Sequence, residues 1–138
     1  MDSIAVEQTV KGRILIIDDD VSILNLLERS LSKAGFLVKT VKDGKKATKL
    51  LDRTHYDMVI TDIFMPNMDG FEVIRNFAPR EVVKIIAMSS GGAKMPQSDI
   101  LEIALQLGAV FSLTKPLKKE LFLNMVQSIL AKGMNDEK

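Results

Sequence analysis

Short runs of apolar residues recur along the chain, and they alternate with segments in which apolar residues return every three or four positions. Uninterrupted runs of this kind are typical of parallel strands that helices cover on both faces. The predicted strands are residues 14–17, 37–41, 58–61, 82–88 and 109–114. The predicted helices lie around residues 23–34, 47–51, 71–77, 98–107 and 118–131. This alternation predicts an α/β fold, a doubly wound five-stranded parallel sheet with helices on both faces.

The pattern fits a single domain. We expect residues 1–11 to be an N-terminal lead-in, residues 12–131 the domain itself and residues 132–138 a flexible C-terminal tail. The lead-in has an early acid and no long apolar segment, and no apolar run approaches the roughly 20 residues that span a bilayer. These features predict a cytoplasmic protein.

The amino-acid composition excludes several classes of protein and of functional site. With 46% hydrophobic and 27% charged residues, the chain has the balance of a soluble globular domain, which excludes a disordered segment. Its 19 basic and 18 acidic residues give a net charge of +1, which argues against a dedicated nucleic-acid binder. The absence of cysteine excludes thiol nucleophiles and thiolate zinc sites, and we assign the single histidine, His55, no metal role.

The residues that could carry chemistry follow the predicted strands. In open parallel sheets, ligands bind beyond the carboxyl ends of the strands. These ends carry, in chain order, Asp18 and Asp19, Asp62, Ser89 and Ser90, and Lys115. Taken singly, each has an ordinary explanation as a turn former or a solvated charge, and Asp20 is best explained as the N-cap of the first helix. Their joint occurrence at the ends of four strands predicts a functional site.

Three carboxylates at one edge of a sheet need compensation. Two carboxylates about 4 Å apart repel each other by roughly 4 kcal/mol at an effective dielectric constant near 20. One remedy is a raised pKa, and the other is a cation, for which oxygen ligands favour Mg²⁺, with Mn²⁺ as a substitute. A metal ion, the Lys115 ammonium and a hydroxyl together could bind a phosphoryl group, with the Asp62 carboxylate as the nucleophile.

Three segments together resemble the receiver domain of two-component response regulators. They are ILIIDDD at residues 14–20, DMVITDIFMPNMDG at residues 57–70 and LTKPL at residues 113–117. The resemblance spans about residues 12–131 and is to the single-domain, chemotaxis-regulator-like kind. It implies a flavodoxin-like sheet with strand order 2-1-3-4-5 and a cis bond between Lys115 and Pro116.

The resemblance also implies a role for each residue at the strand ends. Asp62 would be the phospho-acceptor, and Ser89 and Lys115 would each bind an oxygen of the phosphoryl group. Mg²⁺ would be held by Asp19 directly, by Asp18 mainly through water, by Asp62 and by the backbone carbonyl of Phe64. Phe64 and Gly91 fall at two positions that influence hydrolysis of the phospho-aspartate, and neither side chain can orient a water molecule. We therefore expect slow self-dephosphorylation and no enzyme activity beyond this self-directed chemistry.

The expected partners follow from the same resemblance. The phosphoryl donor would be a sensor histidine kinase or a phosphotransfer protein, and a downstream protein would recognise the changed surface. We expect no direct nucleic-acid partner and no membrane partner. The apolar residues of the fourth predicted helix either pack in the core or contribute, with the fifth strand and fifth helix, to a partner surface: Ile100, Leu101, Ile103, Leu105 and Leu107.

One position departs from the family pattern. Relatives usually carry Tyr or Phe three residues before the conserved Lys, as a switch residue, whereas this chain has Ser112. Phe111 should lie on the opposite face of the strand and cannot replace it. Two alternatives stay open: a receiver that only docks and is not phosphorylated, and a Mg²⁺-dependent small phosphatase that would use Asp18 and Asp20.

Overall fold

The computed structural model describes residues 11–65, 68–80, 83–89 and 95–136. Five parallel strands form one sheet in the order β2-β1-β3-β4-β5, which confirms the predicted sheet and its strand order. The strands are β1 (Arg13–Ile17), β2 (Leu37–Val41), β3 (Met58–Asp62), β4 (Lys84–Ser89) and β5 (Phe111–Thr114). This order makes β1 and β3 neighbours at the centre of the sheet, so residues that follow them meet at one edge.

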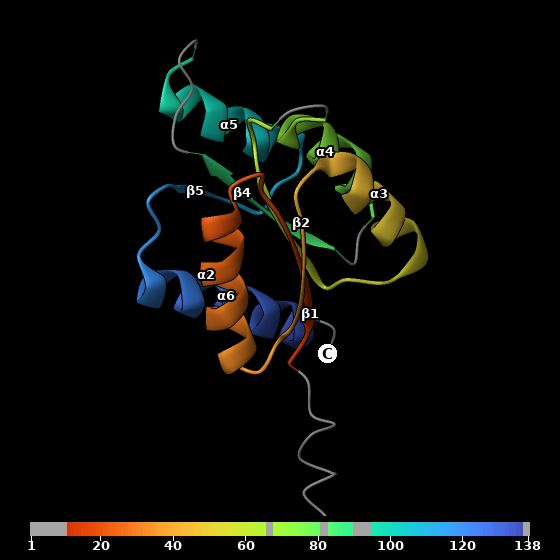
Figure 1. Ribbon diagram of the computed structural model, residues 1–138, viewed down its shortest axis with the longest axis vertical. Coiled ribbons are helices and arrows are strands. Elements are labelled where there is room, and N and C mark those ends of the chain that lie inside the picture. The colour runs from red at the N-terminus through yellow and green to blue at the C-terminus, as the bar shows by residue number, and fades with distance from the viewer. Residues whose placement is uncertain (1–10, 66–67, 81–82, 90–94, 137–138) are drawn as a thin grey trace, which may run out of the picture.

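Helices cover both faces of the sheet (Figure 1). The helices are α2 (Val21–Lys33), α3 (Gly44–Arg53), α4 (Gly70–Phe77), α5 (Gln97–Leu107) and α6 (Lys119–Asp136). Helices α2 and α6 lie on one face, and α3, α4 and α5 lie on the other. In the described ranges, no helix combines the length and the apolar composition that crossing a bilayer requires.

Burial on both faces explains why β1 is apolar without alternation. Ile14 and Ile16 pack in the cluster under α2 and α6, whereas Leu15 and Ile17 pack in the cluster under α3, α4 and α5. All four side chains are fully buried. Each strand residue therefore contributes to one of two cores, as in other sheets with helices on both faces.

Three helices begin at an aspartate N-cap at the carboxyl edge of the sheet. The side chain of Asp20 accepts a hydrogen bond from the backbone amide of Ser22, 2.9 Å away. Asp43 and Asp69 cap α3 and α4 in the same way. The assignment of Asp20 as an N-cap is therefore confirmed, and its side chain serves the helix rather than the site.

Several predicted element boundaries differ from the structure, and three of the differences have a clear local cause or cost. Strand β4 begins at Lys84 rather than at residue 82, because the Val83 amide closes a turn onto the Arg80 carbonyl. Strand β5 begins at Phe111 rather than at residue 109, because the Ala109 amide donates to α5 at the Ala104 carbonyl. Helix α6 continues five residues past 131, through a glycine that costs only about 1 kcal/mol in a helix. Most of the predicted lead-in lies outside the described residues, and the flexibility of the tail remains a prediction.

Candidate functional site

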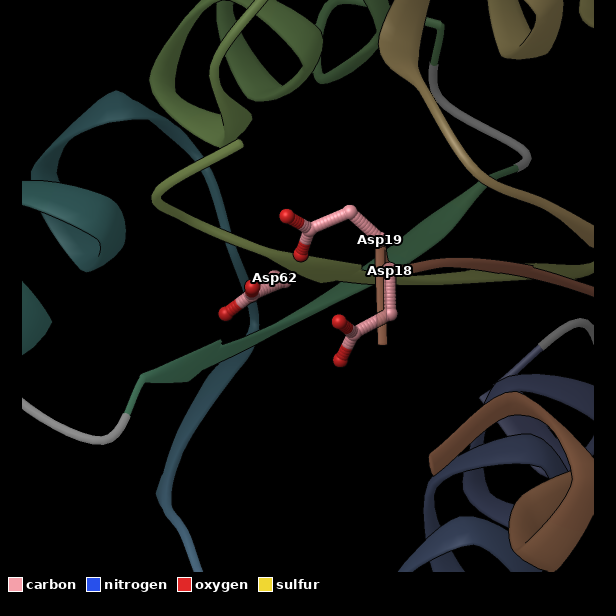
Figure 2. A group of neighbouring side chains, drawn as sticks. All are labelled: Asp18, Asp19 and Asp62. Atoms are coloured by element: carbon pink, nitrogen blue, oxygen red, sulfur yellow. The ribbon is translucent and has the colours of Figure 1, made fainter. Parts of the chain in front are cut away.

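Three carboxylates meet at the carboxyl edge of the sheet. Asp18 and Asp19 follow β1, Asp62 ends β3, and one oxygen of each carboxylate lies within 4.8 Å of the others. Figure 2 shows Asp18 and Asp19 leaving the chain to different sides, with both carboxylates toward Asp62. The parallel register pairs Ile17 with Thr61. The residues that follow them in the chain, Asp18 and Asp62, therefore lie side by side. Asp18 is fully buried, Asp62 is 8% exposed, and Asp19 is open to solvent.

Within the described part of the chain, one ammonium group faces these carboxylates. Lys115 follows β5, and its Nζ atom lies 2.7 Å from Oδ2 of Asp18 and 3.4 Å from Oδ1 of Asp62. Its backbone amide donates to the carbonyl of Ser89 at the end of β4, which fixes the point where the side chain starts. The peptide bond from Lys115 to Pro116 is cis. Residues separated by 97 positions in the sequence thus form a close ion pair.

The charges in this cluster shift two pKa values upward. Burial and then the neighbouring Asp18 raise the pKa of Asp62 to about 6, against the opposing attraction of Lys115. Burial alone would lower the pKa of Lys115, but its hydrogen bond to Asp18 and its attraction to Asp62 and Asp18 outweigh burial and raise it. Lys115 therefore stays protonated, while Asp62 is mostly ionised at pH 7.

The donor set fits a divalent cation. Three carboxylates against one ammonium leave an excess of negative charge, and every candidate ligand atom is a hard oxygen. Both oxygens of Asp18 already accept hydrogen bonds, from the Asp20 amide and from Lys115. Asp19 and Asp62 have more freedom to bind a metal ion directly, so Asp18 is better suited to act through water.

Two further predicted site residues, Ser89 and Phe64, lie close to Asp62 in the sheet or along the chain. Ser89 is buried at the end of β4, the strand beside β3. Phe64 follows β3 by two residues, and its ring is 46% exposed and meets the ring of Phe71 edge-on, with centroids 6.4 Å apart. Ser90 and Gly91 lie outside the described residues.

Gly70, the first residue of α4, contributes to the site although the residues at the strand ends do not point to it. Its amide donates to the Ile63 carbonyl at 2.7 Å, so the helix start lies directly against the residue after Asp62. A Cβ atom at Gly70 would lie 2.2 Å from the carbonyl oxygen of Asp62. Only glycine allows this approach. The sequence feature that could have indicated it is the position of Gly70 at the end of the Met-Asp-Gly segment.

Other candidates lie away from the carboxylates. Asp20 caps α2 and is not among the clustered carboxylates. This placement argues against a phosphatase that uses Asp18 and Asp20. His55 precedes β3, at the other end of the sheet, and its Nε2 atom lies 3.1 Å from Asp57. Ser112 lies beside Ala87, and Phe111 lies beside Ile86, on the opposite face of the sheet, as the alternation of side chains predicts.

The apolar stripe of α5 is only partly in the core. Ile100 is fully buried, whereas Leu105 is 46% exposed. Leu101, Ile103 and Leu107 are half-buried. Core packing therefore does not account for the whole stripe, and the exposed part is available to a partner.

Comparison with known proteins identifies the family. The model of the response regulator receiver domain matches residues 14–127, most of the chain. The chain belongs to the family of response regulator receiver domains of two-component systems.

Solved structures share the fold. A CheY-like receiver domain protein from Methanospirillum hungatei JF-1 superposes with a TM-score of 0.83 at 22% identity, covering 93% of this chain and 99% of that one. The chemotaxis response regulator CheY4 of Vibrio cholerae superposes with a TM-score of 0.77 at 26% identity, covering 88% of this chain and 99% of that one.

Curated relatives are longer proteins. The alkaline phosphatase synthesis transcriptional regulatory protein PhoP of Bacillus subtilis is 32% identical over 121 residues, which are 88% of this chain and 49% of PhoP. The regulatory protein VirG of Agrobacterium fabrum is 34% identical over 117 residues, which are 85% of this chain and 45% of VirG. The chain thus spans about half the length of these relatives.

Proposed function

We propose that this receiver is a phosphorylation-dependent switch whose phospho-acceptor is Asp62. The donor is a phosphohistidine on a sensor histidine kinase or a phosphotransfer protein, in the cytoplasm. The phosphorus–nitrogen bond of the donor breaks as a phosphorus–oxygen bond to the Asp62 carboxylate forms. The observation that carries the proposal is the placement of Asp62 between two further carboxylates and an ammonium 3.4 Å away.

Each neighbour of Asp62 has a task in this reaction. Asp19, Asp62, the Phe64 carbonyl and, through water, Asp18 would hold Mg²⁺, which would supply positive charge as the phosphoryl group approaches the Asp62 carboxylate. The Lys115 ammonium attracts the incoming phosphoryl group. To contact it, the ammonium moves away from Asp18, its partner in the unphosphorylated protein. The Ser89 hydroxyl donates a hydrogen bond to a phosphoryl oxygen. Ionisation of Asp62 at pH 7 supports its role as the nucleophile.

The proposed switch releases its phosphoryl group slowly. The half-exposed ring beside the acceptor, Phe64, has no hydrogen-bonding atom with which to orient a hydrolytic water molecule. Self-phosphorylation and slow self-dephosphorylation are the only chemistry in the proposal. The partner is a protein that contacts the face formed by α5, β5 and α6, where large apolar side chains are exposed: Leu105, Val110, Phe111 and Leu121.

We expect the wild-type protein to gain one phosphoryl group when it is incubated with Mg²⁺ and acetyl phosphate, as measured by intact mass. EDTA should abolish the gain, because the phosphoryl group and the carboxylates repel each other without a divalent cation. Asp62→Asn should remain unmodified. The matched control is Asp52→Asn, which removes the same charge at an exposed position paired with Arg80 and should be modified like the wild type.

The result also separates the two alternatives. A protein that gains no mass and shows no Mg²⁺ binding by calorimetry is a docking module, which the serine at position 112 would suit. Release of phosphate from external phosphomonoesters, without a protein adduct, indicates a phosphatase. Either outcome contradicts the proposed switch.

A further inference from the structure

The carbonyl of Ser89 joins three elements at the edge of the site. Ser89 ends β4, and its carbonyl oxygen accepts the backbone amide of Lys115 at 2.9 Å. The same oxygen accepts a hydrogen bond from Nε2 of Gln97, the first residue of α5, at 2.6 Å. Ser89, which we propose binds the phosphoryl group, is thus hydrogen-bonded both to Lys115 and to the first residue of α5. Helix α5 belongs to the face that we propose contacts the partner protein.

Gln97 is turned inward although it belongs to the first turn of a helix. Its Oε1 atom is buried and accepts no hydrogen bond within the described part of the chain. Because Nε2 is the donor atom of the amide, the contact with the Ser89 carbonyl fixes which way the amide points. An unpaired buried acceptor costs free energy, so this arrangement of Gln97 is less stable than one in which Oε1 accepts a hydrogen bond.

The position on β5 where relatives carry the switch residue has a small side chain in this chain. Ser112 lies beside Ala87 on the face of the sheet that α5 covers, and both are small. Phe111, the neighbouring aromatic residue, lies in register with Ile86 on the other face. Within the described residues, a side-chain amide on α5, rather than an aromatic residue on β5, donates a hydrogen bond to the end of β4.

We propose that Gln97 is the positioning residue that couples the phosphorylation site to α5. This inference rests on the proposed function of Asp62. A phosphoryl group on Asp62 attracts the Ser89 hydroxyl, and a shift of the Ser89 backbone toward it carries the Ser89 carbonyl along. Gln97 follows the carbonyl because its side chain donates a hydrogen bond to it, and the start of α5 moves with Gln97.

The test compares amide NMR spectra with and without acetyl phosphate and Mg²⁺, at equal phosphoryl occupancy by mass. In the wild type we expect shift changes in the side-chain amide of Gln97 and along the backbone amides of residues 98–107. In Gln97→Met, which keeps the length but removes the donor, the changes along α5 should fall by at least half. Gln97→Glu also lacks the donor and should show the same reduction in shift changes along α5. It replaces Gln97→Met in the test if that variant does not fold.

Gln106→Met is the matched control, since Gln106 is an exposed glutamine on the same helix, and its shift changes should equal those of the wild type. Full shift changes along α5 in phosphorylated Gln97→Met, or an unmoved Gln97 side-chain amide in the wild type, would overturn the inference while the switch itself stands. A wild type that takes up no phosphoryl group contradicts the switch, and the inference falls with it.

Discussion

Lys115→Met is expected to lower the free energy of unfolding by about 3–5 kcal/mol at pH 8 in the absence of divalent cations. The variant removes the one ammonium that lies 2.7 Å from Asp18 and 3.4 Å from Asp62. Asp18 is fully buried, so its charge would remain without a counter-ion in a poorly solvated place. Urea denaturation followed by circular dichroism measures the loss.

The cause of this loss can be separated from a general effect of losing a lysine. Lys118→Met, at an exposed position three residues on, should change stability by less than about 0.5 kcal/mol. Added Mg²⁺ should restore part of the stability of Lys115→Met, because a divalent cation replaces the missing positive charge. A loss in Lys118→Met as large as that in Lys115→Met would contradict this account of the cluster.

Asp62→Asn is expected to change stability in the opposite direction to Lys115→Met. It should raise the free energy of unfolding by about 1–3 kcal/mol at pH 8 without divalent cations. Burial and the nearby Asp18 raise the pKa of Asp62 to about 6, so the folded protein is destabilised when this carboxylate ionises. Asparagine has nearly the same shape and no charge. The acceptor residue thus lowers the stability of the unliganded fold.

The pH dependence follows from the direction of the shift. Because the folded pKa of Asp62 exceeds the unfolded value of 3.8, its stabilising contribution is complete below about pH 4 and is lost as the pH rises to about 6. The stability difference between Asp62→Asn and the wild type should therefore grow between pH 4 and pH 6 and stay constant above. Urea titrations across this range measure it. Asp52→Asn is the control, and the same pH-dependent gain there would show that the effect is not specific to the cluster.

The carboxylate cluster could be predicted from the sequence because parallel strands leave little freedom. Once β1 and β3 are neighbours in register, the residues after them must meet, and this brings Asp18 beside Asp62. The apolar runs predict the strands themselves, since both faces of each strand are buried. The fold and the position of the acidic site are thus consequences of a local pattern and one topological rule.

The links between the cluster and its surroundings could not be predicted in this way. The hydrogen bond from Gln97 to the Ser89 carbonyl depends on a rotamer and on packing, and a polar residue in the first turn of a helix usually indicates a solvated position. The contact of Gly70 with the carbonyl of Asp62 depends on how α4 approaches β3. The starts of β4 and β5 were misplaced because Val83 and Ala109 are apolar but use their amides in turns.

Asp62 is the residue to which we expect the phosphoryl group to be attached, and peptide analysis tests this directly. After incubation with Mg²⁺ and acetyl phosphate, borohydride reduction converts an aspartyl phosphate to homoserine, which survives digestion with trypsin. Cleavage after Arg53 and Arg75 yields the peptide 54–75, which contains three aspartates: Asp57, Asp62 and Asp69. We expect fragmentation of this peptide to place the homoserine at position 62. Homoserine at another aspartate, with position 62 unchanged, would contradict the assignment of Asp62 as the phospho-acceptor.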